Sequence, residues 1–173
     1  MSLWLKFLDW FSRVFGIGRR AIPREPVSIR PIGVVRNGVR QPRPGGWAGV
    51  RSDIIVREDL VDALEGIDGY SHVIVLFAFD RVPESELRSR VRPGGDGRVP
   101  EQGVLATRSQ LRPSPIGASV VPLLKRRRNI LRVESLDAID GTPVLDIKPY
   151  FPNYDAVPGA GVPEWARAIE RGE

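Results

Sequence analysis

The chain lacks cysteine altogether and has a single histidine, His72, among its 173 residues. Disulfide bonds and thiolate metal ligands are therefore excluded, and one imidazole cannot form a multi-histidine zinc site. His72 precedes an apolar run, so we interpret it as a residue at the end of a strand. We expect no metal site, and no Cys-His or Ser-His nucleophile unless it uses His72.

Lysine is also scarce. Lys6, Lys125 and Lys148 are the only lysines among 26 basic residues, which outweigh 21 acidic residues and give a net charge of +5. The planar guanidinium of arginine matches phosphate oxygens and base edges with two hydrogen bonds. The same bias also arises from codon composition or adaptation to heat, so on its own it favours an RNA partner only modestly.

Apolar runs long enough to span a membrane are missing as well. Polar residues at helical spacing interrupt the apolar stretch 3–15, and the apolar side of that helix holds Leu3, Trp4, Phe7, Leu8, Phe11, Val14 and Phe15. We predict an amphipathic N-terminal helix with a Gly- and Pro-containing linker at 1–26, ahead of a main domain at 27–173. We expect the helix to pack on protein in the cytoplasm, with peripheral membrane attachment as the less favoured alternative.

The main domain is a series of short apolar runs separated by turn residues. We expect strands at 29–35, 54–56, 73–79, 104–107, 119–124, 130–133 and 144–147, one helix at 58–64 that ends at Gly66, and a short closing helix at 163–171. Consecutive short strands with few helices predict an antiparallel sheet, and closing that sheet removes its exposed edges. The predicted fold is mainly β, a small single-sheeted antiparallel β-barrel.

One segment combines a rigid backbone with positive charge. Pro113 and Pro115 fix φ on both sides of Ser114, and Gly117 admits a turn or a close backbone contact. Arg108 and Arg112 flank this ledge. We expect it to form part of a binding site.

A second segment gathers titratable groups on one strand. Alternation places Asp146 and Lys148 on the same face, close to Asp137, Asp140 and Tyr150. A surface ion pair is the simpler explanation, but the crowding favours a functional role. Asp140 and Gly141 form a strong turn signal, and residues 125–129 are typical of a solvated hairpin tip whose arginines also suit phosphate contact.

The order of four motifs resembles the TsaA-like family, also called the TrmO family. The motifs are Ala-Thr-Arg-Ser at 106–109, Leu-Arg-Pro-Ser-Pro-Ile-Gly at 111–117, Ser-Leu-Asp at 135–137, and Asp-Gly-Thr-Pro-Val-Leu-Asp-Ile-Lys-Pro-Tyr at 140–150. Similar segments occur at 32–36 and 69–77. The resemblance covers roughly residues 28–157.

The resemblance implies a β-barrel that binds S-adenosyl-L-methionine, usually forms a homodimer, and methylates N6 of threonylcarbamoyladenosine beside the tRNA anticodon. By position in the motifs, the cofactor contacts are Phe79, Asp80, Arg81, Arg108, Ala118, Ser135, Leu136 and Asp137. We expect Asp146 to act as the base, held by Lys148 and oriented by Tyr150. We expect the tRNA phosphates and the threonyl carboxylate to be bound by Arg112, Arg126, Arg127 and Arg128.

The chain departs from the family pattern at three places. Leu111 and Ser114 stand where Phe and Asn are usual, and Asp80 stands where His is common. The last change replaces an imidazole by a carboxylate, and the two differ in charge near neutral pH. Two alternatives therefore stay open: a regulatory module that binds the cofactor without catalysis, and a basic RNA-binding barrel.

Overall fold

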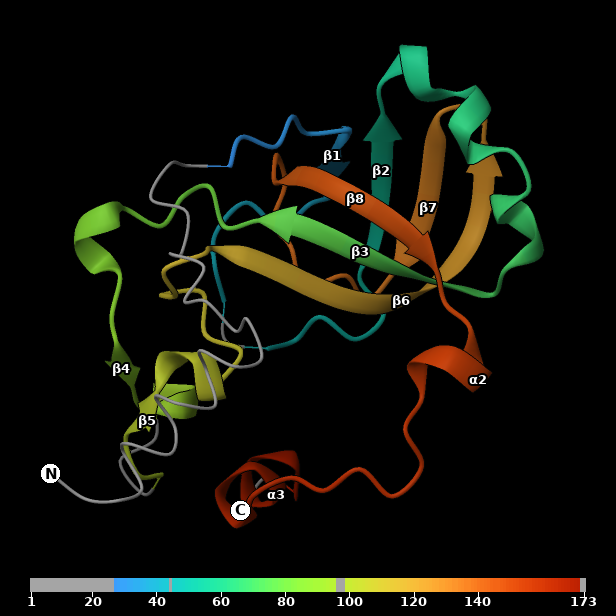
Figure 1. The fold of residues 1–173 in the computed structure, drawn as a ribbon. Coiled ribbons are helices and arrows are strands. Elements are labelled where there is room, and N and C mark those ends of the chain that lie inside the picture. The colour runs from blue at the N-terminus through green and yellow to red at the C-terminus, as the bar shows by residue number, and fades with distance from the viewer. Residues whose placement is uncertain (1–26, 44, 96–98, 172–173) are drawn as a thin grey trace, which may run out of the picture.

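The computed structural model describes residues 27–43, 45–95 and 99–171 (Figure 1). Six antiparallel strands close into one barrel in the order β1-β2-β7-β6-β3-β8. Their bounds are Gly33–Arg36 (β1), Arg51–Val56 (β2), His72–Ala78 (β3), Ile116–Arg127 (β6), Ile130–Glu134 (β7) and Pro143–Pro149 (β8). The predicted small antiparallel barrel is confirmed.

The barrel interior follows the strand alternation of the sequence. In β3, Val73, Val75 and Phe77 are buried, while the residues between them are only half-buried. β-Branched side chains fill most of the interior, because they suit the pleated backbone and pack against neighbouring strands. Fully burying each such side chain stabilises the fold by about 1.5–3 kcal/mol.

The predicted helix at 58–64 is wrong in type. The segment forms two 3₁₀ turns, η1 (Glu58–Leu60) and η2 (Asp62–Leu64), and a third, η3 (Ile67–Gly69), follows Gly66. Gly66 has φ of 80°, a value that glycine adopts without strain. Leu64 alone is buried in η1 and η2, so little packing compensates the cost of starting an α-helix.

The predicted strand at 104–107 is also wrong. Those residues form the turn η6 (Val104–Ala106), in which Thr107 N donates to Val104 O at 3.1 Å. Val104 is buried, but Leu105 is 72% exposed. The side chains of this segment therefore do not pack as those of a barrel strand would. The strand here is β5 (Gln102–Gly103), which pairs with β4 (Arg90–Val91) in a separate small sheet.

Short helices complete the described chain. They are η4 (Glu84–Glu86), η5 (Pro93–Gly95), α2 (Pro152–Asp155) and α3 (Glu164–Arg171), and the last confirms the predicted closing helix. Within the described part, no helix is both long and apolar enough to cross a bilayer. The predicted amphipathic helix and linker at 1–26 lie outside the described residues.

The two ends of the barrel carry different segments (Figure 1). At one end, the β6–β7 hairpin turns through Arg128 and Asn129 and lies beside η1 to η3, which confirms the predicted hairpin tip. Asn129 Nδ2 fixes this turn by donating to Val56 O at 2.7 Å. The β1–β2 loop, the long β3–β6 connection and the β7–β8 connection meet at the opposite end. His72 begins β3, as expected of a structural residue.

Gly117 gives a direct test of barrel packing. A Cβ atom at this position would lie 2.4 Å from Cε2 of the buried Phe77 ring. We expect Gly117→Ala to lower the free energy of unfolding by about 1–3 kcal/mol, because the ring must move. Gly38→Ala is the matched control, since a Cβ atom at Gly38 would have no neighbour within 4 Å. Equal urea midpoints for the two variants would contradict this packing.

Candidate cofactor and substrate site

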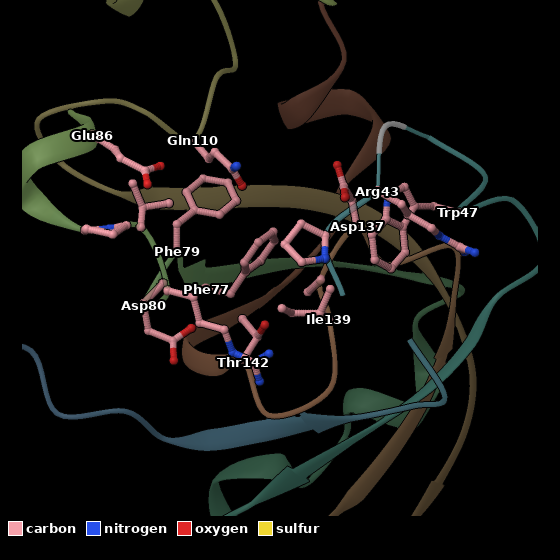
Figure 2. A pocket seen from close by; sticks show the side chains of 16 residues that line it. Arg43, Trp47, Phe77, Phe79, Asp80, Glu86, Gln110, Asp137, Ile139 and Thr142 are labelled. Atoms are coloured by element: carbon pink, nitrogen blue, oxygen red, sulfur yellow. The ribbon is translucent and has the colours of Figure 1, made fainter. Parts of the chain in front are cut away.

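Two adjoining hollows open at the loop-bearing end of the barrel. The first, here the aromatic hollow, has a volume of about 280 Å³ and is lined in part by Trp47, Phe77, Phe79, Asp80, Glu86 and Asp137 (Figure 2). The second, the arginine hollow, has a volume of about 360 Å³ and is lined in part by Arg108, Arg112, Gly117, Ala118, Ser135 and Asp137. Phe77, Phe79 and Asp137 belong to both, so the two spaces adjoin along this common wall.

The end of β3 forms the aromatic part of this wall. The Phe77 and Phe79 rings meet edge to face with centroids 5.4 Å apart. Phe79 N donates to Pro115 O at 2.8 Å, which joins the end of β3 to the proline ledge. The ledge predicted from the sequence therefore lies beside the end of β3 that lines both hollows.

Asp137 is the acidic group of the shared wall. Burial raises the pKa of its carboxyl, and the positive charge of Arg108 partly offsets that rise. The residue is nevertheless open to solvent. A ligand in either hollow can therefore meet a carboxylate that is a stronger base than an ordinary aspartate.

Ser135 and Leu136, the two residues before Asp137, fix the position of its backbone. Leu136 is fully buried and anchors the segment in the core, so its side chain is a packing group. Ser135 has φ of 64°, and its Oγ accepts a hydrogen bond from Gly49 N at 3.1 Å. The β7–β8 connection is thereby fixed to the β1–β2 loop.

A polar network holds the same connection from its other side. Asn37 Nδ2 donates to Ser52 Oγ and to Ala138 O, both at 2.9 Å. Asn37 N donates to Asp140 Oδ1 at 3.0 Å, which fixes the predicted turn at Asp140 and Gly141. The sequence did not reveal this role of Asn37, because the Asn37-Gly38 pair signals a turn but not a half-buried amide with these partners.

The Arg81 side chain joins this network by donating hydrogen bonds to backbone carbonyl groups. Its guanidinium donates to Asp140 O at 2.7 Å and to Arg40 O at 3.1 Å. The side chain lies in the wall of the aromatic hollow and ties two loops together. Its neighbour Asp80, which stands in the place of the family histidine, lines the same hollow.

The ledge arginines lie together in the arginine hollow. Arg108 Nη2 donates to Ala118 O at 3.1 Å, and Arg112 Nη1 donates to Thr107 O at 3.4 Å. Among the predicted cofactor residues, Phe79, Arg108, Ala118, Ser135 and Asp137 line this one space. The structure thus brings together residues that lie far apart in the sequence.

Asp146 lies elsewhere. Lys148 Nζ is 2.6 Å from Asp146 Oδ2, which confirms that the two share a strand face, and this contact raises the pKa of Lys148. Asp146 lines a third space of about 500 Å³, the far hollow, with residues of β8 and the 3₁₀ segment such as Leu64 and Ile147. Tyr150 N donates to His72 O at 3.2 Å near the same end. A single chain therefore does not unite Asp146 with Arg108 and Asp137.

The hairpin arginines also lie at the far end. Arg126 contacts Asp68 Oδ2 at 3.5 Å and donates to Val61 O at 3.3 Å, and Arg128 contacts Glu58 Oε2 at 3.1 Å. These contacts hold the hairpin against η1 to η3. The predicted RNA-binding set is thus divided, with Arg112 at the hollows and Arg126 to Arg128 at the opposite end.

The two hollows fit a nucleoside that carries a positive charge. Aromatic rings offer surfaces for a purine, and Asp80, Glu86 and Asp137 offer carboxylates to a cation. Arg108 and Arg112 offer guanidinium groups to a ligand carboxylate. These features match the chemistry of S-adenosyl-L-methionine, which combines an adenosine, a sulfonium and a carboxylate.

Comparison with known proteins identifies the family. The model of the tRNA-methyltransferase O N-terminal domain matches residues 36–156. An S-adenosyl-L-methionine-binding protein of Archaeoglobus fulgidus is 41% identical over 133 residues, which are 75% of this chain and 93% of that protein. The tRNA (adenine(37)-N6)-methyltransferase of Escherichia coli is 40% identical over 143 residues, 75% of this chain and 60% of the relative.

The fold agrees with these matches. The crystal structure of TrmO from Pseudomonas aeruginosa superimposes with a TM-score of 0.62 and 37% identity, over 79% of this chain and 62% of that one. The chain therefore spans less than two thirds of both methyltransferase relatives, although it spans nearly all of the archaeal one. The match at 36–156 confirms the resemblance, and the chain belongs to the TrmO family.

Proposed function

We propose that this protein transfers a methyl group from S-adenosyl-L-methionine to N6 of an adenine in tRNA, with threonylcarbamoyladenosine beside the anticodon as the acceptor, in the cytoplasm. The observation that carries the proposal is the pair of hollows that share Asp137. A methyl donor bound in these hollows and an acceptor base that enters the same opening would meet beside Asp137. The E. coli relative is a tRNA (adenine(37)-N6)-methyltransferase and the A. fulgidus relative is an S-adenosyl-L-methionine-binding protein, which supports the same chemistry.

The protein's task in such a transfer is mainly alignment. S-adenosyl-L-methionine supplies a methyl group bound to a positively charged sulfur. Phe77 and Phe79 present rigid surfaces against which a base is held, and the proline ledge fixes Arg108 and Arg112 beside them. Holding the donor and the acceptor in line lowers the activation barrier of the transfer, because their translational and rotational entropy is already lost on binding.

The acceptor nitrogen loses a proton when it gains the methyl group, and Asp137 is placed to take it. The carboxylate lies in the wall common to both hollows, and burial raises its pKa. A base whose pKa is closer to the working pH accepts a proton more effectively. We therefore assign to Asp137 the role that the sequence had suggested for Asp146.

We propose that Asp146 contributes to the hollows from a second copy of the chain, since within one chain it lines the far hollow. Leu76 pairs with Ala118 on one side and Asp146 on the other, so the three residues share the outer face of the barrel. Next to them, Val120 is 53% exposed and Ile116 is 41% exposed. We propose that a homodimer covers this apolar face beside the arginine hollow, with Lys148 and Tyr150 supporting Asp146 from the partner.

Transfer of label is the first prediction. We expect wild-type protein with methyl-labelled S-adenosyl-L-methionine to label tRNA at N6 of adenine, and mass spectrometry of digested nucleosides identifies the product. Label must be absent if the protein is a regulatory cofactor-binding module or a plain RNA-binding barrel. Cofactor-dependent thermal stabilisation separates those two, because a ligand specific for the folded state raises the melting temperature.

The second prediction concerns the base. Asp137→Asn should lower the single-turnover rate about 10²- to 10⁴-fold while tRNA binding is kept, because the amide cannot accept the proton. Asp146→Asn tests the alternative base, and its loss of rate should be smaller. A larger loss in Asp146→Asn than in Asp137→Asn would return the role to Asp146.

The third prediction is a pH dependence. Methyl transfer requires ionised Asp137, so its rate should fall as pH drops through the raised pKa of this group. Arg108→Gln removes the positive charge that favours the carboxylate, so the pKa must rise further and the acidic limb must move to higher pH. Carboxyl NMR titration measures the shift directly. A midpoint that moves to lower pH, or does not move, contradicts the assignment.

The fourth prediction concerns the second copy. Val120→Arg should convert a dimer into a monomer, because it places a charge in the middle of the covered apolar face. Val157→Arg is the control, since Val157 is 71% exposed and lies outside the barrel. Light scattering gives the mass of each variant. A monomeric wild-type protein rules the dimer out.

A further inference from the structure

We propose that the RNA backbone docks on an arginine rim around the two hollows, formed by Arg40, Arg43, Arg88 and Arg112, and not on the basic hairpin at 125–128. The inference rests on the proposed function, since it places the phosphates of that substrate. It reverses the expectation from sequence, where the run of arginines in the hairpin is the most obvious phosphate site.

Two of the four basic residues of the hairpin, Arg126 and Arg128, are paired with carboxylates, whereas Lys125 and Arg127 have no carboxylate oxygen within 4.0 Å among the described residues. The carboxylate pairs near that end and along β2 and β7 are Arg57 with Asp59, Arg126 with Asp68, Arg128 with Glu58, and Arg132 with Asp53. In the pair of Arg132 and Asp53, both guanidinium contacts are short, at 2.7 and 2.8 Å. A phosphate would have to compete with these carboxylates for each guanidinium.

Arginines of the rim keep their full charge. Arg43 donates to Gly46 O, Arg88 donates to Ser85 O at 2.8 Å and Leu87 O at 3.0 Å, and Arg112 donates to Thr107 O at 3.4 Å. A carbonyl oxygen orients a guanidinium without cancelling its charge. In the described part of the chain, neither these arginines nor Arg40 has a carboxylate oxygen within 4.0 Å.

The rim lies on both sides of the hollows. Arg40 and Arg43 belong to the β1–β2 loop, and Arg43 rests on the Trp47 ring at 4.7 Å, beside Asp137 in the view of Figure 2. Arg88 N donates to Leu111 O at 2.9 Å, which places Arg88 beside Arg112 across the opening. A strand of RNA that lowers one base into the opening would pass its phosphates over both sides.

Charges inside the opening have the opposite sign. Asp80, Glu86 and Asp137 line the aromatic hollow, where they suit a cationic methyl donor. The site therefore pairs a carboxylate-lined interior with a guanidinium rim. This arrangement separates the cationic cofactor from the anionic backbone of the substrate.

Distance also separates the hairpin from the chemistry. The strand β6 begins at the arginine hollow with Ile116 and reaches the hairpin at Arg127. Its 12 residues span about 35–40 Å at the usual rise per residue. Within one chain, the phosphates next to the target base therefore lie closer to the rim than to the hairpin, so we assign the positioning of the reacting nucleotide to the rim.

The test compares two double charge reversals. Arg40→Glu with Arg88→Glu alters the rim, and Lys125→Glu with Arg127→Glu alters the hairpin by the same total charge. All four side chains are exposed. Binding of anticodon stem-loop RNA is measured across a salt series, and cofactor-dependent thermal stabilisation checks that each variant folds and binds cofactor.

We expect the rim variant to lose about tenfold or more in RNA affinity, and its salt slope to become shallower by about 0.7–0.9 for each phosphate that it no longer binds. The hairpin variant should stay within about twofold of wild type with an unchanged slope. Equal losses in both variants, or a loss in the hairpin variant alone, would overturn the docking site. Unchanged RNA binding by the rim variant would also overturn it, and would leave the rim to an acidic protein partner.

The two proposals fail in different ways. If wild-type protein neither binds nor methylates tRNA, the proposed function is wrong. If wild-type protein methylates tRNA and the rim variant does so with unchanged affinity, only the docking surface is wrong. The neutral pair Arg40→Gln with Arg88→Gln provides a milder check, and its affinity should fall between those of wild type and the rim reversal.

Discussion

The close contact between Gly117 and Phe77 determines the architecture of the site. β3 pairs with β6 on one side and with β8 on the other, and Gly117 lies directly opposite Phe77 in this register. Only a residue without a side chain lets the Phe77 ring lie over β6, since a Cβ would be 2.4 Å from the ring. Phe79 then meets Phe77 edge to face, and Pro115 accepts the backbone hydrogen bond of Phe79. The wall between the two hollows is therefore a consequence of strand packing.

The opposite side of the site depends on polar contacts. The β7–β8 connection that carries Asp137 has no regular hydrogen-bond ladder, so its backbone groups need other partners. Asn37 Nδ2 donates to Ala138 O and Arg81 donates to Asp140 O, while Asp140 N and Gly141 N donate to carbonyl groups in and just after β1. This network explains how a solvent-facing carboxylate is held in a fixed position on an irregular segment.

Arginine has two uses in this protein, which its abundance in the sequence does not distinguish. On the strands and at the hairpin, guanidinium groups pair with carboxylates and join neighbouring segments. Around the hollows, they rest on carbonyl oxygens or on an aromatic ring and keep their charge for a ligand. The position of acidic residues relative to each arginine separates the two uses.

The sequence by itself determined the local structure and the family. Alternation and turn residues fixed most barrel strands, the turn at Gly141, the hairpin at 125–129 and the shared face of Asp146 and Lys148, because each depends on residues a few positions apart. It failed at 58–64 and at 104–107, where little burial was available to select the regular element. Only the tertiary structure decided that Asp137 joins Arg108 while Asp146 faces another hollow. That outcome depends on strand register and barrel closure, which bring together residues distant in the sequence and place Asp137 and Asp146 in different hollows.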